Sequence, residues 1–204
     1  MQILRLVSAW LLRHWIIVNN GSQIYTGGIF GCQYWGGSVY TTSISKCTAQ
    51  ITLEAKGTAT SSNPIRYGGL FGYSIPYQND SQLNSIICIR CGFHVKVKPF
   101  ADALGIIVGG LTNNVTTTAM GGRTSFTECY AVVELDGQGF TEDTIHIDGI
   151  SRTNTYLITR CFFDREKLEA TYTRYENNYV YAGTGITTEQ MKSRDFLASQ
   201  GWSI

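Results

Sequence analysis

Three segments of the chain alternate between apolar and polar residues, and each begins at a cysteine. Counted in steps of two from the cysteine, the positions are apolar, and the positions between them are mostly polar. The apolar rows are Cys47, Ala49, Ile51 and Leu53; Cys91, Phe93, Val95 and Val97; and Cys129, Ala131, Val133 and Leu135. Alternation with a period of two predicts strands that bury one face and expose the other.

These strands recur as repeats, with a weaker fourth copy that begins at Cys161. One unit of this size cannot bury its own apolar row, so successive copies are expected to stack. In that register Glu54, Lys98 and Asp136 alternate in sign on the exposed face, and Lys96 lies beside Glu134, an arrangement that favours pairing. The residue before each cysteine is charged: Lys46, Arg90, Glu128 and Arg160.

A glycine motif precedes each strand. Its copies are Gly27-Gly28-Ile29-Phe30-Gly31, Gly68-Gly69-Leu70-Phe71-Gly72, Gly105-Ile106-Ile107-Val108-Gly109 and a degenerate Ile147-Asp148-Gly149-Ile150-Ser151. With the cysteine strands and the tail from Gly183 to Trp202, these motifs resemble the GLUG-type repeat over roughly residues 25–172. The resemblance implies a parallel β-helix of the kind found mainly in surface-displayed or secreted proteins, usually without catalytic activity.

We therefore predict an all-β fold, a right-handed parallel β-helix of about four irregular coils with short capping helices at the N- and C-terminal ends. The predicted parts are an N-terminal cap (1–24), repeats at about 25–57, 66–100, 105–137 and 145–172, and a tail (173–204). The first residues carry apolar side chains at helical spacing and pass into a strand near Trp15–Val18. Thr187 and Gln190 form a capping-box pattern, which predicts a helix over about 188–199 that covers the end of the stack.

Charge and hydropathy exclude some classes of protein. The net charge of +1 is not the basic excess of a nucleic-acid-binding protein. Arg13 and His14 interrupt the apolar N-terminal stretch, so neither a membrane span nor a clear signal peptide is predicted. The localisation stays open: the resemblance favours a secreted or surface protein, whereas the missing signal and the cysteines are compatible with an intracellular or virion assembly.

The chain has six cysteines. For Cys47, Cys91, Cys129 and Cys161 we favour a buried structural ladder of thiols, with disulfides between adjacent repeats and metal binding as alternatives. Cys88 and Cys91 form the chain's one C-x-x-C motif, and their odd separation on a strand predicts opposite faces. Cys88 aligns with Ile44, Phe126 and Ile158, so it is expected to fill an apolar site. No cofactor is predicted.

Catalytic groups do not converge in the sequence, so we do not predict an enzyme. The candidates for a pair of catalytic acids are Asp143, Asp148, Asp164 and Glu166. Possible ligand or partner contacts are the aromatic residues after the first two glycine motifs: Tyr34, Trp35, Tyr73 and Tyr77.

The expected function is a non-catalytic scaffold, either a repeat module of an adhesin-like surface or secreted protein or a component of a large assembly such as a virion or cytoskeletal lattice. The alternative is a protein that binds or degrades polysaccharide on the same scaffold. The expected partners are proteins, the rest of a longer polypeptide or assembly, or glycans, but not nucleic acid.

Overall fold

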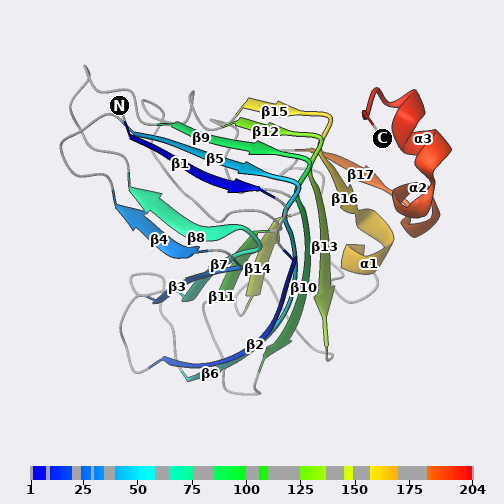
Figure 1. The fold of residues 1–204 in the computed structure, drawn as a ribbon. Helices are drawn as coiled ribbons and strands as arrows, with labels where there is room; N and C mark the ends of the chain where they lie inside the picture. Colours follow the sequence, from blue (N-terminus) through cyan, green and yellow to red (C-terminus); the bar gives the residue numbers. More distant parts are fainter. Residues whose placement is uncertain are drawn as a thin grey trace.

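The computed structural model describes residues 2–7, 10–19, 24–28, 30–34, 40–57, 65–75, 85–99, 106–109, 125–136, 145–148, 157–169 and 183–203. Their strands pair in parallel and form sheets of five, six, four and two strands, which we name sheets A, B, C and D. Each sheet takes its strands from successive repeats, so the colours of Figure 1 run in sequence order across sheets A, B and C.

Neighbouring strands within each sheet come from neighbouring repeats. In spatial order, sheet A contains β1 (Gln2–Val7), β5 (Tyr40–Ser45), β9 (Ser85–Ile89), β12 (Ser125–Thr127) and β15 (Leu157–Thr159). Sheet B contains β17 (Thr184–Ile186), β16 (Phe162–Asp164), β13 (Tyr130–Leu135), β10 (Gly92–Pro99), β6 (Thr48–Gly57) and β2 (Trp10–Asn19). Sheet C contains β14 (Ile145–Asp148), β11 (Ile106–Gly109), β7 (Ile65–Gly68) and β3 (Ile24–Gly27), and sheet D contains β4 (Phe30–Tyr34) and β8 (Phe71–Ile75).

The alternation in the sequence sets the register of sheet B. Phe93 of β10 pairs with Ala49 of β6 on one side and with Ala131 of β13 on the other. All three side chains are buried, as the apolar rows predict. Figure 1 shows sheet A and sheet C on the same side of sheet B, and their buried residues include Ile44, Cys88 and Tyr67. Each fully buried large apolar side chain contributes about 1.5–3 kcal/mol to stability.

The fold class that we predicted from the sequence is wrong as stated. We expected an all-β, right-handed parallel β-helix of about four coils, with a capping helix at each end. The described residues form parallel sheets together with three short α-helices, an arrangement of α/β type, and no closed coil can be traced through them. Alternation and repeat spacing specify which residues face inward and which strands pair, but they carry no information on the path between sheets.

The N-terminal helix is also wrong. Residues that were expected to form it lie in β1 and β2, the edge strands of sheets A and B. Within β2, Leu11 pairs with Ala49 and Trp15 with Leu53. By pairing with β6, β2 covers a strand that would otherwise be the edge of sheet B, and this outweighs a helical spacing of apolar residues.

The third glycine motif is shifted from its predicted place. Gly27 pairs with Gly68, and Gly68 pairs with Gly109, where we had aligned Gly105. Asp148 then pairs with Gly109. When the sequence is aligned from Gly109, Gly109-Gly110-Leu111 matches Gly68-Gly69-Leu70 more closely than the segment that we chose. The apolar run before Gly109 is β11 itself.

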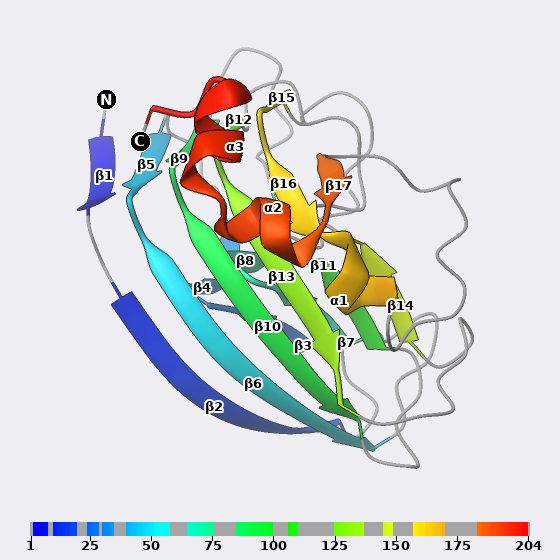
Figure 2. The ribbon, with the colours of Figure 1, turned by 90° about the vertical axis from the view of Figure 1, so that its right-hand side faces the viewer.

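Three helices lie near the carboxyl end of the chain, beside sheet B (Figure 2). They are α1 (Arg165–Glu169), α2 (Thr188–Lys192) and α3 (Arg194–Ser199). The predicted capping box of Thr187 and Gln190 is present at the start of α2. The single helix expected over 188–199 is interrupted at Ser193, whose extended backbone ends α2 and whose side chain accepts a hydrogen bond from the Phe196 amide to begin α3.

Candidate functional site

The charged residue before each cysteine has a left-handed backbone. Lys46, Arg90, Glu128 and Arg160 have φ angles of 54°, 55°, 52° and 50°. They form the corner at which each repeat passes from sheet A to sheet B. A left-handed conformation costs roughly 1–2 kcal/mol in a residue with a Cβ atom, so the surroundings must hold it.

Backbone hydrogen bonds between repeats hold these corners. The Lys46 amide donates to the Ile89 carbonyl at 3.0 Å, and the Arg90 amide donates to the Thr127 carbonyl at 2.9 Å. The Glu128 amide donates to Thr159 in the same way, at 3.0 Å. The corners at Lys46, Arg90 and Glu128 are therefore each held by the repeat that follows, so their conformation depends on the stacking of the repeats.

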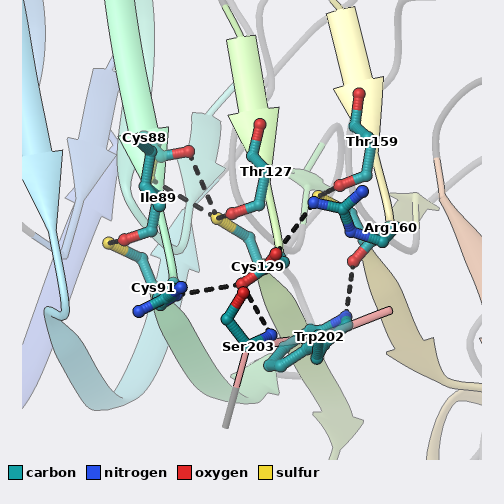
Figure 3. A network of polar contacts seen from close by, with 12 residues as sticks. Cys88, Ile89, Cys91, Thr127, Cys129, Thr159, Arg160, Trp202 and Ser203 are labelled. Carbon is teal, nitrogen blue, oxygen red and sulfur yellow. Dashed lines mark hydrogen bonds and ion pairs between the residues drawn. The ribbon is translucent and has the colours of Figure 1, made fainter. Parts of the chain in front are cut away.

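The cysteines that follow the corners are buried and lie in one column. The Cys47 carbonyl accepts from the Gly92 amide at 2.9 Å, and the Cys91 carbonyl accepts from the Tyr130 amide at 2.9 Å. Cys129 continues the column through the Phe162 amide, and Cys161 through the Thr184 amide. Each thiol donates to the carbonyl two residues before it, at 3.2–3.5 Å, and Figure 3 shows this for Cys91 and Cys129. None of the cysteines whose side chains the structure describes forms a disulfide.

Cys88 and Cys91 do not lie on opposite faces. Both are fully buried. The left-handed turn at Arg90 lies between them and interrupts the alternation of a continuous strand, so both side chains face the interior. The predicted alignment of Cys88 is confirmed, since it pairs with Ile44 on one side and with Phe126 on the other.

Two of the buried thiols, Cys88 and Cys129, are neutral at ordinary pH, whereas hydrogen bonds with Cys129 and Cys88 lower the pKa of Cys91 to about 4, and a hydrogen bond with Cys129 lowers the pKa of Cys161. Burial raises the pKa of Cys88 well above that of an exposed thiol. Hydrogen bonds with the Cys161 and Cys88 thiols raise the pKa of Cys129. Thiolate is the reactive form of cysteine, so Cys88 and Cys129 react slowly while they are buried.

Glu128 is the acidic residue among the four corner residues, and it forms two ion pairs. Its side chain is only 4% exposed, and it lies between Arg90 and Arg160. Its oxygens accept from Arg90 Nε at 2.9 Å and from Arg160 Nη2 at 2.8 Å. The Ser203 amide is 3.3 Å from Oε2 (Figure 3). Burial raises the pKa of Glu128, but these hydrogen bonds lower it by more, so its pKa lies below that of a free glutamate.

The C-terminal tail packs on the outward side of the same corner. Trp202 donates from Nε1 to the Arg160 carbonyl at 2.8 Å and stacks on Phe162, with ring centroids 5.9 Å apart. The Tyr130 ring is 6.5 Å from Trp202, and the Phe196 ring is 6.3 Å from Phe162. Phe162 points outward from sheet B, and the tail leaves it only 5% exposed.

Replacing Trp202 by alanine is expected to lower the free energy of unfolding by about 1–2 kcal/mol, through loss of its hydrogen bond and of its ring contacts. Trp202→Phe should recover most of the loss, because it retains the stacking. Urea denaturation measures the free energy of unfolding of both variants. If Trp202→Ala matches the wild type, the tail does not hold the corner.

Ion pairs follow the exposed face of sheet B. Lys98 lies 3.9 Å from Glu54 and 3.8 Å from Asp136, as the predicted alternation of charge requires. Lys96 pairs in register with Glu134, but its ammonium group contacts Asp136 at 3.3 Å. The Glu134 carboxylate instead forms an ion pair with Lys167 of α1, with 3.1 Å between Oε1 and Nζ. The sequence alone did not predict this pair.

The candidate catalytic acids within the described chain have structural contacts. Asp164 is 3% exposed and accepts from the Lys167 amide at 3.0 Å and from the Thr188 hydroxyl at 2.8 Å. Glu166 accepts from the Thr188 amide at 2.9 Å. The two acids thus join α1 to the start of α2. Asp148 lies in β14, and Asp143 lies outside the described residues.

The candidate aromatic contacts are only partly described. Tyr34 lies in β4 and Tyr73 in β8, where Tyr73 pairs with Cys32 and Tyr34 pairs with Ile75. The two tyrosines are therefore diagonal neighbours in sheet D. Trp35 and Tyr77 lie outside the described residues. A contact surface made by these residues stays a prediction.

Comparison with models of known protein families, with curated proteins and with solved structures found no match. Among the described residues, no three His, Cys, Asp or Glu side chains are placed to hold a metal ion. The helices of the described chain are all too short and too polar to cross a membrane.

Proposed function

We propose that this chain is a non-catalytic structural scaffold. It would serve as a repeat module of an adhesin-like surface or secreted protein or as a component of a large assembly. The main support for the proposal is the buried carboxylate of Glu128, whose hydrogen bonds connect two neighbouring repeats and the tail. The likeness of its motifs to GLUG-type repeats supports the same function.

The contacts of Asp164 and Glu166 also favour a scaffold over a polysaccharide-degrading enzyme. A glycosidase needs two carboxyl groups directed at the scissile bond, about 5–10 Å apart. Asp164 is buried against Lys167 and Thr188, and its oxygens already accept hydrogen bonds from them. A carboxylate used in this way contributes to stability.

A comparison of Asp164→Ala with the wild type tests the proposal. We expect the variant to lose roughly 1–2 kcal/mol of unfolding free energy, because the Lys167 amide and the Thr188 hydroxyl lose their acceptor. Glu166→Gln, at an exposed position, is the matched control and should lose less than about 0.5 kcal/mol. Chemical denaturation gives both values.

The same proteins are incubated with neutral and acidic polysaccharides, and the release of reducing ends is measured. We expect no product from the wild type or from either variant, and binding of glycan without product is consistent with an adhesin-like scaffold. Product release by the wild type that Asp164→Ala abolishes at unchanged stability would overturn the proposal in favour of the enzyme.

A further inference from the structure

The sulfur atoms of Cys88 and Cys129 lie 3.8 Å apart in the core. Cys88 lies at the end of β9, before the corner of the second repeat, and Cys129 follows the corner of the third. The Cys129 thiol also points at the Cys88 carbonyl, 3.6 Å away (Figure 3). The two side chains therefore approach each other across the boundary between two repeats.

We propose that Cys88 and Cys129 form a disulfide that joins the second and third repeats when the chain folds in the presence of a small-molecule disulfide. A disulfide needs its sulfur atoms about 2.05 Å apart, so they must approach by roughly 1.8 Å in total. Small rotations about the two Cα–Cβ bonds provide a movement of this size. The inference goes beyond the scaffold function and does not depend on it.

Vertical pairs within the cysteine column are less suited to the bond. Cys91 and Cys129 follow equivalent corners of adjacent repeats and point in the same direction. Side chains stacked in this way on parallel strands keep their Cβ atoms about one strand spacing apart, ~4.8 Å, which exceeds the 3.5–4.5 Å that a disulfide prefers. Cys88 approaches Cys129 from sheet A, so this pair is not restricted by the strand spacing.

The reaction is ordinary thiol–disulfide exchange with glutathione disulfide as the oxidant. The thiolate of one cysteine attacks a glutathione sulfur, forms a mixed disulfide and releases one glutathione. The second cysteine attacks the protein sulfur of that mixed disulfide, forms the Cys88–Cys129 bond and releases the second glutathione. The two cysteines lose two electrons, glutathione disulfide gains them, and the two thiol protons end on the two glutathione thiols.

Burial determines when the reaction takes place. Both thiols are 0% exposed, and their raised pKa keeps them protonated in the folded chain. We therefore expect slow oxidation of the folded protein and rapid oxidation during refolding, when the thiols are accessible. Once formed, the bond closes a long loop and restricts the unfolded chain.

The test is to refold the reduced protein with glutathione disulfide, block the remaining thiols, digest the chain and map the linked peptides by mass spectrometry. We expect the Cys88–Cys129 link as the main product and a rise in Tm on the order of 5–10 °C over the reduced protein. Cys88→Ala and Cys129→Ala should each abolish the link and the rise, while Cys47→Ala and Cys161→Ala should retain both. Refolded protein with Cys88 and Cys129 both alkylated, or with links spread evenly over other pairs, would overturn the proposal; this mapping needs only the wild-type chain.

Discussion

Replacing Gly28 by alanine is expected to lower the free energy of unfolding by roughly 3 kcal/mol. A Cβ atom built on Gly28 would lie 2.1 Å from the Gly69 carbonyl oxygen and 2.6 Å from Cδ1 of Ile51. The Gly28 amide already donates to that same carbonyl, at 3.0 Å. The clash is therefore with backbone that takes part in the stack.

The loss at Gly28 is steric and not conformational. The φ angle of Gly28 lies outside the left-handed range, so alanine could adopt its backbone conformation if there were room. Relief requires the first two glycine motifs to move apart, and that movement would break the hydrogen bond between them. Thermal and urea denaturation of the purified variant measure the loss.

Two other glycines provide matched controls. At Gly185 the nearest atom to a Cβ is on the Phe163 ring, at 2.9 Å, and a small shift of the ring relieves it, so Gly185→Ala should lose about 1 kcal/mol or less. At Gly92 a Cβ would enter the Tyr130 ring, so Gly92→Ala should be partly rescued by Tyr130→Ala. If Gly28→Ala is no worse than Gly185→Ala, the glycine motifs do not pack as the structure shows.

The pairing of strands within sheet B was predictable because it depends on local alternation. Steps of two from each cysteine identify the buried row, and the observed register of Ala49, Phe93 and Ala131 follows from aligning the cysteines. The ion pairs of Lys98 with Glu54 and Asp136 follow from the same alignment. These features need only the period of a strand and the assumption that like stacks on like.

The sequence could not reveal features that depend on how the chain turns. Glycine commonly marks a left-handed residue, but the corners use Lys46, Arg90, Glu128 and Arg160, and only a charge before each cysteine was visible. Because the turn at Arg90 was missed, Cys88 and Cys91 were assigned to opposite faces. The fold class failed for a related reason: no local pattern describes the connections between sheets.

The burial of Glu128 was hidden because it depends on distant segments. Its equivalents in the other repeats are basic, and its own position in the sequence predicts only an exposed charge at the end of a strand. It becomes buried when Arg90 and Arg160 of the neighbouring repeats and Ser203 of the tail meet around it. Charge alternation along the aligned positions 90, 128 and 160 was the one available signal.

Glu128→Gln is expected to lower the free energy of unfolding at neutral pH by roughly 2–3 kcal/mol, the second large effect. The amide preserves the shape of the side chain but removes its charge. It also turns an NH₂ group toward a guanidinium group or the Ser203 amide, where only an acceptor fits. Glu169→Gln is the matched control: Glu169 pairs with Arg165 at 3.8 Å, both side chains are about half exposed, and the loss should be below about 0.5 kcal/mol.

The pH dependence separates the lost charge from lost packing. The pKa of Glu128 is lower in the folded chain than in the unfolded chain, so its charge stabilises the fold fully above the unfolded pKa of about 4.3. This contribution is lost as the pH falls through the lower, folded pKa. The difference in unfolding free energy between wild type and Glu128→Gln should therefore shrink as the pH is lowered from 7 to below 4.

Urea denaturation of both proteins across that pH range gives the difference directly, and other carboxylates that titrate in the same range cancel in it. Glu134 also has a lowered pKa, since the hydrogen bond from Lys167 and the charge of His94 outweigh its burial, but it is unchanged in both proteins. A difference that stays constant from pH 7 to pH 3 would mean that the variant loses packing only. Glu128 would then not be the charged centre that holds two repeats and the tail together.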